Sequence, residues 1–379
     1  MLQSFVVYGG LMLIMIFLGA RYTYTYNNGM TQKEPFWQLE IMTTILVFAF
    51  ICGIRYDVGV DYPTYLKTIK YVNNHPFVSS LTDYEIGFVW ILKFFANLNA
   101  HFAWVFGFFA FLQLFFIYYA FKKERYLYPF LAFIIMTGGL YFTMMNEIRQ
   151  SVVWCILILA VQFANRKNIL IYFSLMLVGL IFHKSAIMFI PLYFILNSDK
   201  DFFKSIKLQI LLLFSVMALA EVNVWDALMD QITFLIEIFN YGDRYGDLAS
   251  RMEIWQMDYS KGIRYYGPFV IYFLIIIHSK KLKTYFKKTT FIKYYNLFFI
   301  GVLLFFITYT NTLMQRPARY FIVMQLVISA YFLYYFWYKH QKTIMNILLL
   351  IMFILLHLAI LFAFLKSDHA TNYLFFWEN

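Results

Sequence analysis

Residues 343–365 read TIMNILLLIMFILLHLAILFAFL, an apolar run without a single Asp, Glu, Lys or Arg side chain. A helix needs about 20 mainly apolar residues to cross the hydrocarbon core of a bilayer, and this run is long enough. The rest of the chain has the same character, because 62% of its 379 residues are apolar and only 13% are charged. This apolar share exceeds that of ordinary globular proteins by a wide margin. The sequence therefore predicts an integral membrane protein.

Eleven further apolar segments accompany this run, and together they predict an all-α, polytopic fold with about twelve transmembrane helices. The first is expected to be an uncleaved span. Because no long polar linker interrupts the chain, we expect a single multi-span domain over 1–379, with one sizeable polar loop at about 222–266. The apolar segments are 4–20, 38–54, 102–121, 127–145, 148–164, 169–182, 185–197, 206–221, 267–278, 294–310, 318–338 and 343–365.

The loops between these segments differ in charge, and the difference predicts their orientation. Lysine-rich loops belong on the cytoplasmic side of a membrane, and 15 of the 21 lysines fall in loops that are assigned to that side. The net charge of +11 is therefore assigned to the cytoplasmic face rather than to a nucleic-acid site. The lysine-rich loops include 121–125, 165–168, 198–207, 278–293 and 338–342, and the loops expected outside are 146–150, 183–185, 222–266 and 311–319.

One segment breaks this alternation of sides. Residues 84–98 read YEIGFVWILKFFANL, which is short for a span and carries Lys93. We expect a re-entrant or interfacial helix on the outer face, with both of its ends outside. If this segment instead crosses the membrane, the orientation of the N-terminal third is inverted.

Arginine is distributed differently from lysine. Seven of the ten arginines fall in loops that are expected outside. The planar guanidinium binds carboxylate or phosphate through two parallel hydrogen bonds, which suggests a task other than setting orientation. These seven residues are Arg55, Arg149, Arg244, Arg251, Arg264, Arg316 and Arg319.

Two of the outer arginines are expected in the first turn of a helix. Arg149 follows Asn146, a plausible N-cap, and Arg319 follows Pro317, a favoured first helical residue. A helix N-terminus is partially positive, so a cation there is disfavoured unless an anion offsets it. We therefore expect a pocket for phosphate or pyrophosphate that includes Arg55. The alternative is anchoring at the membrane interface, or pairing with the nearby acids Glu147, Asp57 and Asp61.

Several side chains are candidates for a general base. His183 lies in an outer turn within IFHKSAIMFIP, residues 181–191, and histidine titrates near neutral pH and can accept a proton from a sugar hydroxyl. A membrane histidine that simply satisfies its own hydrogen bonds is an equally good interpretation. The candidate bases are His183, Asp61, Glu147 and Glu85.

The stretch RYDVGVDYPTY, residues 55–65, contains Asp57 and Asp61. Gly59 and Pro63 predict a loop that leads into a short amphipathic helix at about 62–72. The two carboxylates could orient Arg55, bind sugar hydroxyls or hold a divalent metal. A metal is the least favoured of these, because no second cluster with ligand spacing accompanies the pair.

Aromatic and polar side chains suited to sugar contact lie in the same outer loops. Tyr65, Glu85 and Tyr245 are predicted to contact glycan, and Arg244 is a further phosphate candidate. For Arg244 and Tyr245 an ordinary interfacial loop is the alternative. The sequence contains no P-loop, dinucleotide fingerprint, HExxH or CxxC, so we expect neither a cofactor nor a metal. The DKD pattern at 199–201 lies in a cytoplasmic turn and is interpreted as chance.

Five motifs, in this order and spacing, resemble the EpsG-like family of bacterial polysaccharide polymerases, a branch of the Wzy type. They are RYDVGVDYPTY, YEIGFVWIL, NEIRQSV, IFHKSAIMFIP and YGDRYGD. The likeness covers roughly residues 40–340. Within it, the positions matching Arg55, Asp61, Arg149, His183 and Arg244 are the implied functional ones, and Arg319 is a looser match.

The resemblance implies a metal-independent glycosyltransferase on the outer face of the bacterial inner membrane. Such an enzyme transfers a growing glycan from an undecaprenyl pyrophosphate carrier to a hydroxyl of another lipid-linked repeat unit. The implied partners are this lipid-linked oligosaccharide, the bilayer and a chain-length regulator, with no nucleic acid.

Two other functions remain open. An O-antigen ligase would use the same pyrophosphate pocket, and a flippase would carry the same lipid without making a bond. A transporter should line its path with polar groups near mid-membrane. Here the ionisable residues lie mostly at the ends of the apolar segments, which argues against transport.

Overall fold

The computed structural model describes residues 2–27, 35–75, 81, 84–164, 168–222, 261–310, 312–339, 343–367 and 371–378. Each of the twelve predicted apolar segments contains helix, which confirms the all-α class. The chain packs as two compact units. Unit 1 comprises Met1–Asp199 with Ser329–Asn379, and unit 2 comprises Lys200–Ile328. The expectation of a single domain stays a prediction.

Unit 1 is built around a central helix. In α8 (Ile148–Val161) every residue from Gln150 to Val161 is buried, and a helix that is buried on all sides belongs in the core. It packs against α5, α9 and α7, while α2 packs on α5 and α1 packs on α2 and α6. The other bounds are α1 Leu2–Asn27, α2 Leu39–Gly53, α3 Tyr62–Asn74, α4 Ile86–Asn97, α5 Phe102–Ala120, α6 Tyr128–Thr137, α7 Leu140–Asn146, α9 Ile169–Phe182, α10 Phe189–Leu196, α18 Gln325–Tyr334 and α19 Ile344–Ser367.

Four helices in the described chain are long and apolar enough to cross a membrane. A fifth is added if α6 and α7, which are bent by 68° at Gly138 and Gly139, form one broken span. Seven further apolar helices have only 10–17 residues, and at about 1.5 Å per residue they fall short of a roughly 30 Å core. The predicted number of about twelve spans is therefore not confirmed. The four long helices are Leu2–Thr23, Phe102–Ala120, Gln315–Lys339 and Ile344–Lys366.

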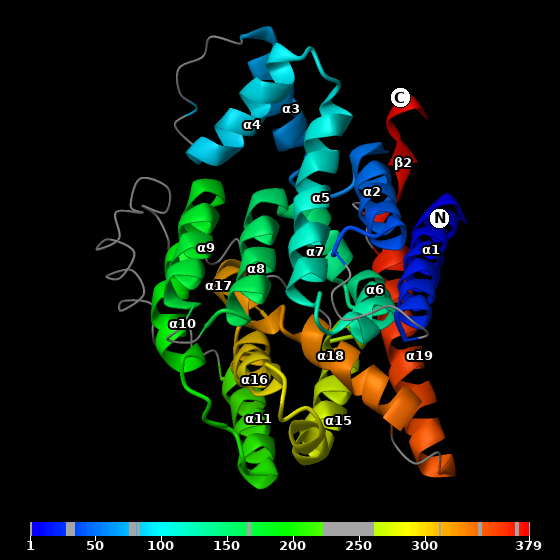
Figure 1. Cartoon of the computed structure of the whole chain (residues 1–379), viewed down its shortest axis with the longest axis vertical. Coiled ribbons are helices and arrows are strands. Elements are labelled where there is room, and N and C mark those ends of the chain that lie inside the picture. Colours follow the sequence, from blue (N-terminus) through cyan, green and yellow to red (C-terminus); the bar gives the residue numbers. More distant parts are fainter. Residues whose placement is uncertain are drawn as a thin grey trace. The chain divides into compact units, whose positions relative to one another are not determined.

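The unusual segment at 84–98 forms α4, which has 12 residues. Its length is about 18 Å at 1.5 Å per residue, too short to cross a bilayer. Figure 1 shows α4 beside α3 and beyond the ends of α8 and α9. Its placement against a membrane stays a prediction.

A short sheet joins the end of α2 to the C-terminal segment. Strand β1 (Arg55–Tyr56) pairs antiparallel with β2 (Leu374–Phe375), and Arg55 stands opposite Phe375. The hydroxyl of Tyr373 also donates to the carbonyl oxygen of Ile51 at 2.6 Å. The C-terminal segment thus supports the loop that carries Arg55, a contact that no motif in the sequence indicated.

Unit 2 contains four helices in its described part. They are α11 (Ile206–Ala220), α15 (Ile263–Tyr285), α16 (Phe291–Ile307) and α17 (Thr312–Ile322), and the boundary at Ile328 falls within α18. Helix α16 packs against α11, α15 and α17, so it forms the centre of this unit. Most of the predicted polar loop at 222–266 lies outside the described residues.

Candidate functional site

Arg149 lies at the junction between α7 and α8, as the second residue of α8. Its predicted position in a first helical turn is confirmed. The predicted cap is wrong, because Asn146 is the last residue of α7 and Glu147 is the residue that precedes α8. The Oδ1 atom of Asn146 instead accepts a hydrogen bond from the backbone N–H of Asp61 at 2.9 Å. The amide side chain therefore ties two of the predicted motifs together.

The guanidinium of Arg149 is paired with the carboxylate of Glu85, the residue that precedes α4. Both side chains are largely buried, with 15% of Arg149 and 10% of Glu85 exposed. The second carboxylate oxygen of Glu85 accepts the backbone N–H of Lys184 at 3.3 Å. Glu85 thus joins the start of α8 to the turn that follows α9.

This arrangement depends on a close approach between α4 and the end of α9. A Cβ atom at Gly87 would lie 2.2 Å from Cγ2 and 2.8 Å from the carbonyl oxygen of Ile181. Only glycine lets the two backbones come this near without displacement. The glycine in the YEIG motif therefore brings Glu85 within reach of Lys184.

Three aromatic rings surround the Arg149 guanidinium. Its Cζ atom lies 4.7 Å from the ring centre of Tyr84, 5.3 Å from that of Phe88 and 6.0 Å from that of Tyr65. At such distances aromatic rings attract a cation. Burial raises the pKa of the Tyr65 phenol above its ordinary value of 10.0, and Arg149 opposes that rise. Tyr65 is therefore a neutral phenol at physiological pH.

We refer to Arg149, Glu85, Tyr65, Tyr84 and Phe88 as the Arg149 cluster. Its guanidinium keeps one unused donor, because Nε of Arg149 is buried and has no hydrogen-bond partner among the described residues. A buried donor without a partner is uncommon and costs free energy. An anion that replaced or joined Glu85 would satisfy it.

Arg55 is placed differently from Arg149. It is 1% exposed, and its donors reach the backbone carbonyls of Met145 at 3.0 Å, Val58 at 3.4 Å and Cys52. Its Cζ atom also lies 4.6 Å from the ring centre of Phe106. In this structure Arg55 joins the end of α2 to the end of α7, and its pyrophosphate contact stays a prediction.

The loop from Arg55 to Tyr62 follows the sequence expectation. Asp57 and Gly59 adopt positive φ angles of 51° and 102°, and α3 then begins at Tyr62, so the predicted loop and short helix are confirmed. Asp61 precedes α3 and is held through its backbone by Asn146. Tyr65, one turn into α3, is directed to Arg149.

His183 caps the short 3₁₀ helix Lys184–Met188 that follows α9. Its Nδ1 atom accepts the backbone N–H of Ser185 at 3.2 Å and lies 2.5 Å from the Ser185 hydroxyl oxygen. His183 is the chain neighbour of Lys184, whose backbone N–H is hydrogen-bonded to Glu85 of the Arg149 cluster. Glu147, the other candidate at this junction, stands two residues before Arg149.

Arg319 was predicted in a first helical turn, and this prediction is wrong. Helix α17 begins at Thr312, contains Pro317 in its interior and carries Arg319 in its last turn. The carbonyl oxygen of Arg319 accepts the backbone N–H of Val323 at 3.0 Å, so the helical chain continues beyond it. The pyrophosphate contact of Arg319 stays a prediction. Arg244 and Tyr245 lie outside the described residues.

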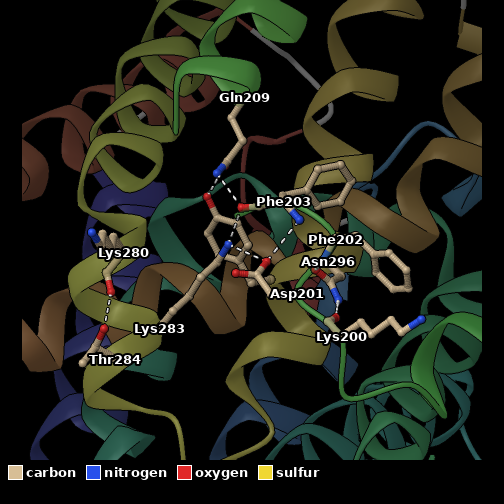
Figure 2. A network of polar contacts seen from close by, with 10 residues as sticks. Lys200, Asp201, Phe202, Phe203, Gln209, Lys280, Lys283, Thr284 and Asn296 are labelled. Carbon is tan, nitrogen blue, oxygen red and sulfur yellow. Dashed lines mark hydrogen bonds and ion pairs between the residues drawn. The ribbon is translucent and has the colours of Figure 1, made fainter. Parts of the chain in front are cut away.

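Asp201, the second aspartate of the DKD pattern, belongs to a buried network of polar side chains in unit 2 (Figure 2). The Nζ atom of Lys283 donates to Asp201 at 2.8 Å and to the carbonyl oxygen of Phe203 at 2.7 Å. Gln209 donates to the same carbonyl at 2.8 Å and accepts from the Tyr295 hydroxyl at 2.5 Å. The chance interpretation of the DKD pattern thus missed a structural role for Asp201.

The same network holds the chain before α11 in place. The side-chain amide of Asn296 donates to the carbonyl of Lys200 at 2.8 Å and accepts the backbone N–H of Phe202 at 3.3 Å. Burial lowers the pKa of Lys283, and Asp201 opposes that change. We refer to Lys283, Asp201, Gln209, Tyr295 and Asn296 as the Lys283 cluster.

A sequence model of the EpsG family matches residues 39–376, which is most of the chain. The chain belongs to the EpsG family. No curated protein and no solved structure matches it. The family and the apolar helices together indicate a membrane protein of polysaccharide biosynthesis. The match to the EpsG family also confirms the resemblance read from the motifs.

Four of the motifs that carried the EpsG resemblance meet in unit 1 through the contacts of Asn146, Glu85 and Lys184. The fifth, YGDRYGD, lies outside the described residues. Among the residues that the structure describes, no group of three His, Cys, Asp or Glu side chains is placed to hold a metal ion. The charged side chains of the Arg149 cluster are Arg149 and Glu85.

Proposed function

We propose that this EpsG-family protein is a Wzy-type polymerase, a glycosyltransferase that joins undecaprenyl-pyrophosphate-linked repeat units into a surface polysaccharide. The observation that supports this most directly is the Arg149 cluster. A guanidinium with an unused donor, held among aromatic rings at a helix N-terminus, is suited to a pyrophosphate. We place the site on the outer face of the inner membrane, by the distribution of lysine.

In the proposed reaction an acceptor hydroxyl oxygen attacks the anomeric carbon of the donor glycan. The bond from that carbon to the pyrophosphate oxygen breaks, and its electron pair leaves with the carrier. Arg149 stabilises the charge that grows on the pyrophosphate, with Arg55 holding the adjoining loop. The guanidinium supplies the positive charge for this step, so the proposal calls for no metal.

The hydroxyl proton passes to a base near the Arg149 cluster. His183 is the first candidate, because it stands next to Lys184, which is bonded to Glu85. Asp61 and Glu147 are the alternatives, since both lie at the α7–α8 junction or against it. Glu85 orients Arg149, and Tyr65 presents a neutral phenol toward the same place. Tyr245 and Arg244 stay candidates for glycan and phosphate contact.

A ligase that moves finished glycan to another acceptor would use the same cluster, and a flippase would bind the same lipid. Product analysis separates them. A ladder of repeat lengths indicates a polymerase, whereas a single transfer to a different acceptor indicates a ligase. New glycosidic bonds in vesicles that contain no other enzyme exclude a flippase alone.

The direct test uses purified protein and lipid-linked repeat unit. We expect Arg149→Ala to lower the rate of polymer formation by about 10²–10³-fold, the usual effect of losing one donor to a developing anion. The matched control is Arg21→Ala, because Arg21 forms a pair with Glu40 at 3.4 Å with 63% of its side chain exposed. Wild-type polymer formation by both Arg149→Ala and His183→Ala at equal expression would refute the site.

A further inference from the structure

Unit 1 contains an apolar cavity of about 230 Å³ that is separate from the Arg149 cluster. It lies between α1, the first half of α6, the end of α18 with the π-helical turn Tyr335–Lys339, and α19. The walls include Ile16, Phe130, Phe133 and Ile354. These apolar walls offer an occupant almost no polar partner, so the cavity is suited to an apolar one.

The cavity is open on one side, where aromatic side chains form its rim. Trp337 is 46% exposed and Tyr338 is 60% exposed, and Ala20 on α1 is also exposed. The ring centres of Phe130 and Tyr338 are 6.1 Å apart. Exposed Trp and Tyr side chains are typical of the level where lipid headgroups meet acyl chains.

Basic residues stand at the same end of these helices. Lys122 and Lys123 precede α6 by a few residues, and Lys339 directly follows the aromatic rim. The Nζ atom of Lys122 lies 3.7 Å from the ring centre of Tyr119. All three lysines fall in, or at the edge of, loops that the sequence assigns to the cytoplasm. Lysines beside a membrane attract anionic lipids.

Glu124, which follows Lys122 and Lys123, is directed toward aromatic hydroxyls. One carboxylate oxygen of Glu124 accepts hydrogen bonds from the hydroxyls of Tyr331 at 2.6 Å and Tyr126 at 3.1 Å. Burial raises the pKa of Glu124 above its ordinary value, and the two tyrosines oppose that rise. The cavity therefore combines an apolar interior, an aromatic rim and an excess of lysine.

We propose that this cavity binds one acyl chain of an anionic phospholipid, whose headgroup lies against Lys122, Lys123 and Lys339. The site goes beyond the proposed polymerase reaction, because none of its residues belongs to the Arg149 cluster. It lies at the start of α6, whereas Asn146 is the last residue of α7 and Arg149 lies in the first turn of α8. A lipid bound here would join α1, α6 and α19 at the cytoplasmic end of unit 1.

The test compares anionic with zwitterionic lipid on the purified full-length protein in detergent. Dioleoyl phosphatidylglycerol should raise the Tm by about 3 °C or more, since a ligand that binds only the folded state stabilises it. Dioleoyl phosphatidylcholine should raise it by less than half as much. The Ala20→Trp variant, which fills the opening, should lose most of the phosphatidylglycerol shift, and Ile354→Phe provides a second filled cavity if Ala20→Trp does not fold.

Two further variants make the outcome decisive. Phe17→Trp is the matched control, because Phe17 lies on α1, is 63% exposed and does not line the cavity. It should keep the full shift. Lys122→Glu combined with Lys339→Glu should remove the preference for the anionic lipid. Equal shifts for the two lipids, an unchanged shift in the filled variants, or a polyprenyl phosphate as the lipid retained in native mass spectra would overturn the proposal.

Discussion

The Lys283 cluster and the Arg149 cluster contain the same ingredients and use them differently. Each pairs a largely buried cation with a carboxylate against aromatic rings. In the Lys283 cluster the ammonium contacts three partners, which are the Asp201 carboxylate, the Phe203 carbonyl oxygen and the Tyr295 ring. In the Arg149 cluster one donor of the guanidinium stays without a partner among the described residues.

The two clusters also differ in the chain segments that they join. Lys283 holds a single turn before α11 against α15, with α16 closing the network. Glu85 and Arg149 join three separate helix ends, at the starts of α4 and α8 and after α9. A cluster whose hydrogen bonds are complete stabilises the fold, whereas we propose that the spare donor of Arg149, at a meeting of helix ends, serves a ligand. The same side-chain chemistry therefore supports different roles.

The largest expected effect is on the stability of unit 2. Asp201→Ala leaves the buried Lys283 ammonium with the Phe203 carbonyl and the Tyr295 ring but no carboxylate. Losing one partner of a buried ion pair costs about 3–5 kcal/mol. Thermal or denaturant unfolding in detergent measures this loss. Lys280→Met is the control on the same helix, because the Lys280 side chain is exposed. If both variants unfold alike, the Lys283 cluster does not hold this unit together.

The same variant should change how stability depends on pH. Burial already lowers the folded-state pKa of Lys283 from 10.5, and removing Asp201 lowers it further. Between that lowered pKa and 10.5 the unfolded chain binds more protons than the folded one, so stability rises with pH. We expect Asp201→Ala to recover stability as the pH is raised through this interval, and to recover more than the wild type does. A flat profile would contradict the buried pair.

The next prediction distinguishes two roles in the Arg149 cluster, the orientation of Arg149 by Glu85 and the proposed binding of pyrophosphate by Arg149. Glu85→Gln keeps an oxygen for the Lys184 N–H but removes the charge that orients Arg149. A hydrogen bond to a charged group is worth about 1.5–3 kcal/mol, so polymer formation should fall about 10–100-fold. This loss should be smaller than that of Arg149→Ala. If Glu85→Gln lowers polymer formation more than Arg149→Ala does, Glu85 acts in catalysis and does not only orient Arg149.

A smaller effect tests the close approach that positions Glu85. Gly87→Ala places a Cβ atom against Ile181 and should push α4 away from α9, at a cost of about 1–3 kcal/mol. Polymer formation should fall along with the Tm. Gly9→Ala is the matched control, because its Cβ would meet nothing within 4 Å in α1, and alanine there should stabilise by about 0.5–1 kcal/mol.

The smallest expected effect comes from removing one tyrosine hydroxyl from each cluster. Tyr295→Phe removes the bond to Gln209 and should destabilise by about 0.5–1.5 kcal/mol without a specific change in activity. Tyr84→Phe removes the bond to Thr68, at 3.0 Å, but keeps the ring over Arg149. It should cost similar stability and leave polymer formation within about threefold of wild type. Parallel melting curves and rate measurements check both.

Several features could be predicted from residues that lie close together in the sequence. The loop at Asp57 and Gly59, the short helix after it and the first-turn position of Arg149 depend on local backbone preference, and the structure confirms them. Local reasoning was wrong at Asn146 and at Arg319. Asn146 is bonded to a distant backbone N–H instead of capping α8, and Pro317 lies inside a helix instead of beginning one.

By itself, the sequence determined the membrane class, the α-helical segments and the family, because apolar runs and short motifs are properties of neighbouring residues. Only the tertiary structure decided which arginine is buried on carbonyls, which is paired with a carboxylate, and which aspartate completes a network. Partners such as Glu85 and Arg149 are 64 residues apart. Their distance in space depends on the packing of whole helices, which no local pattern contains.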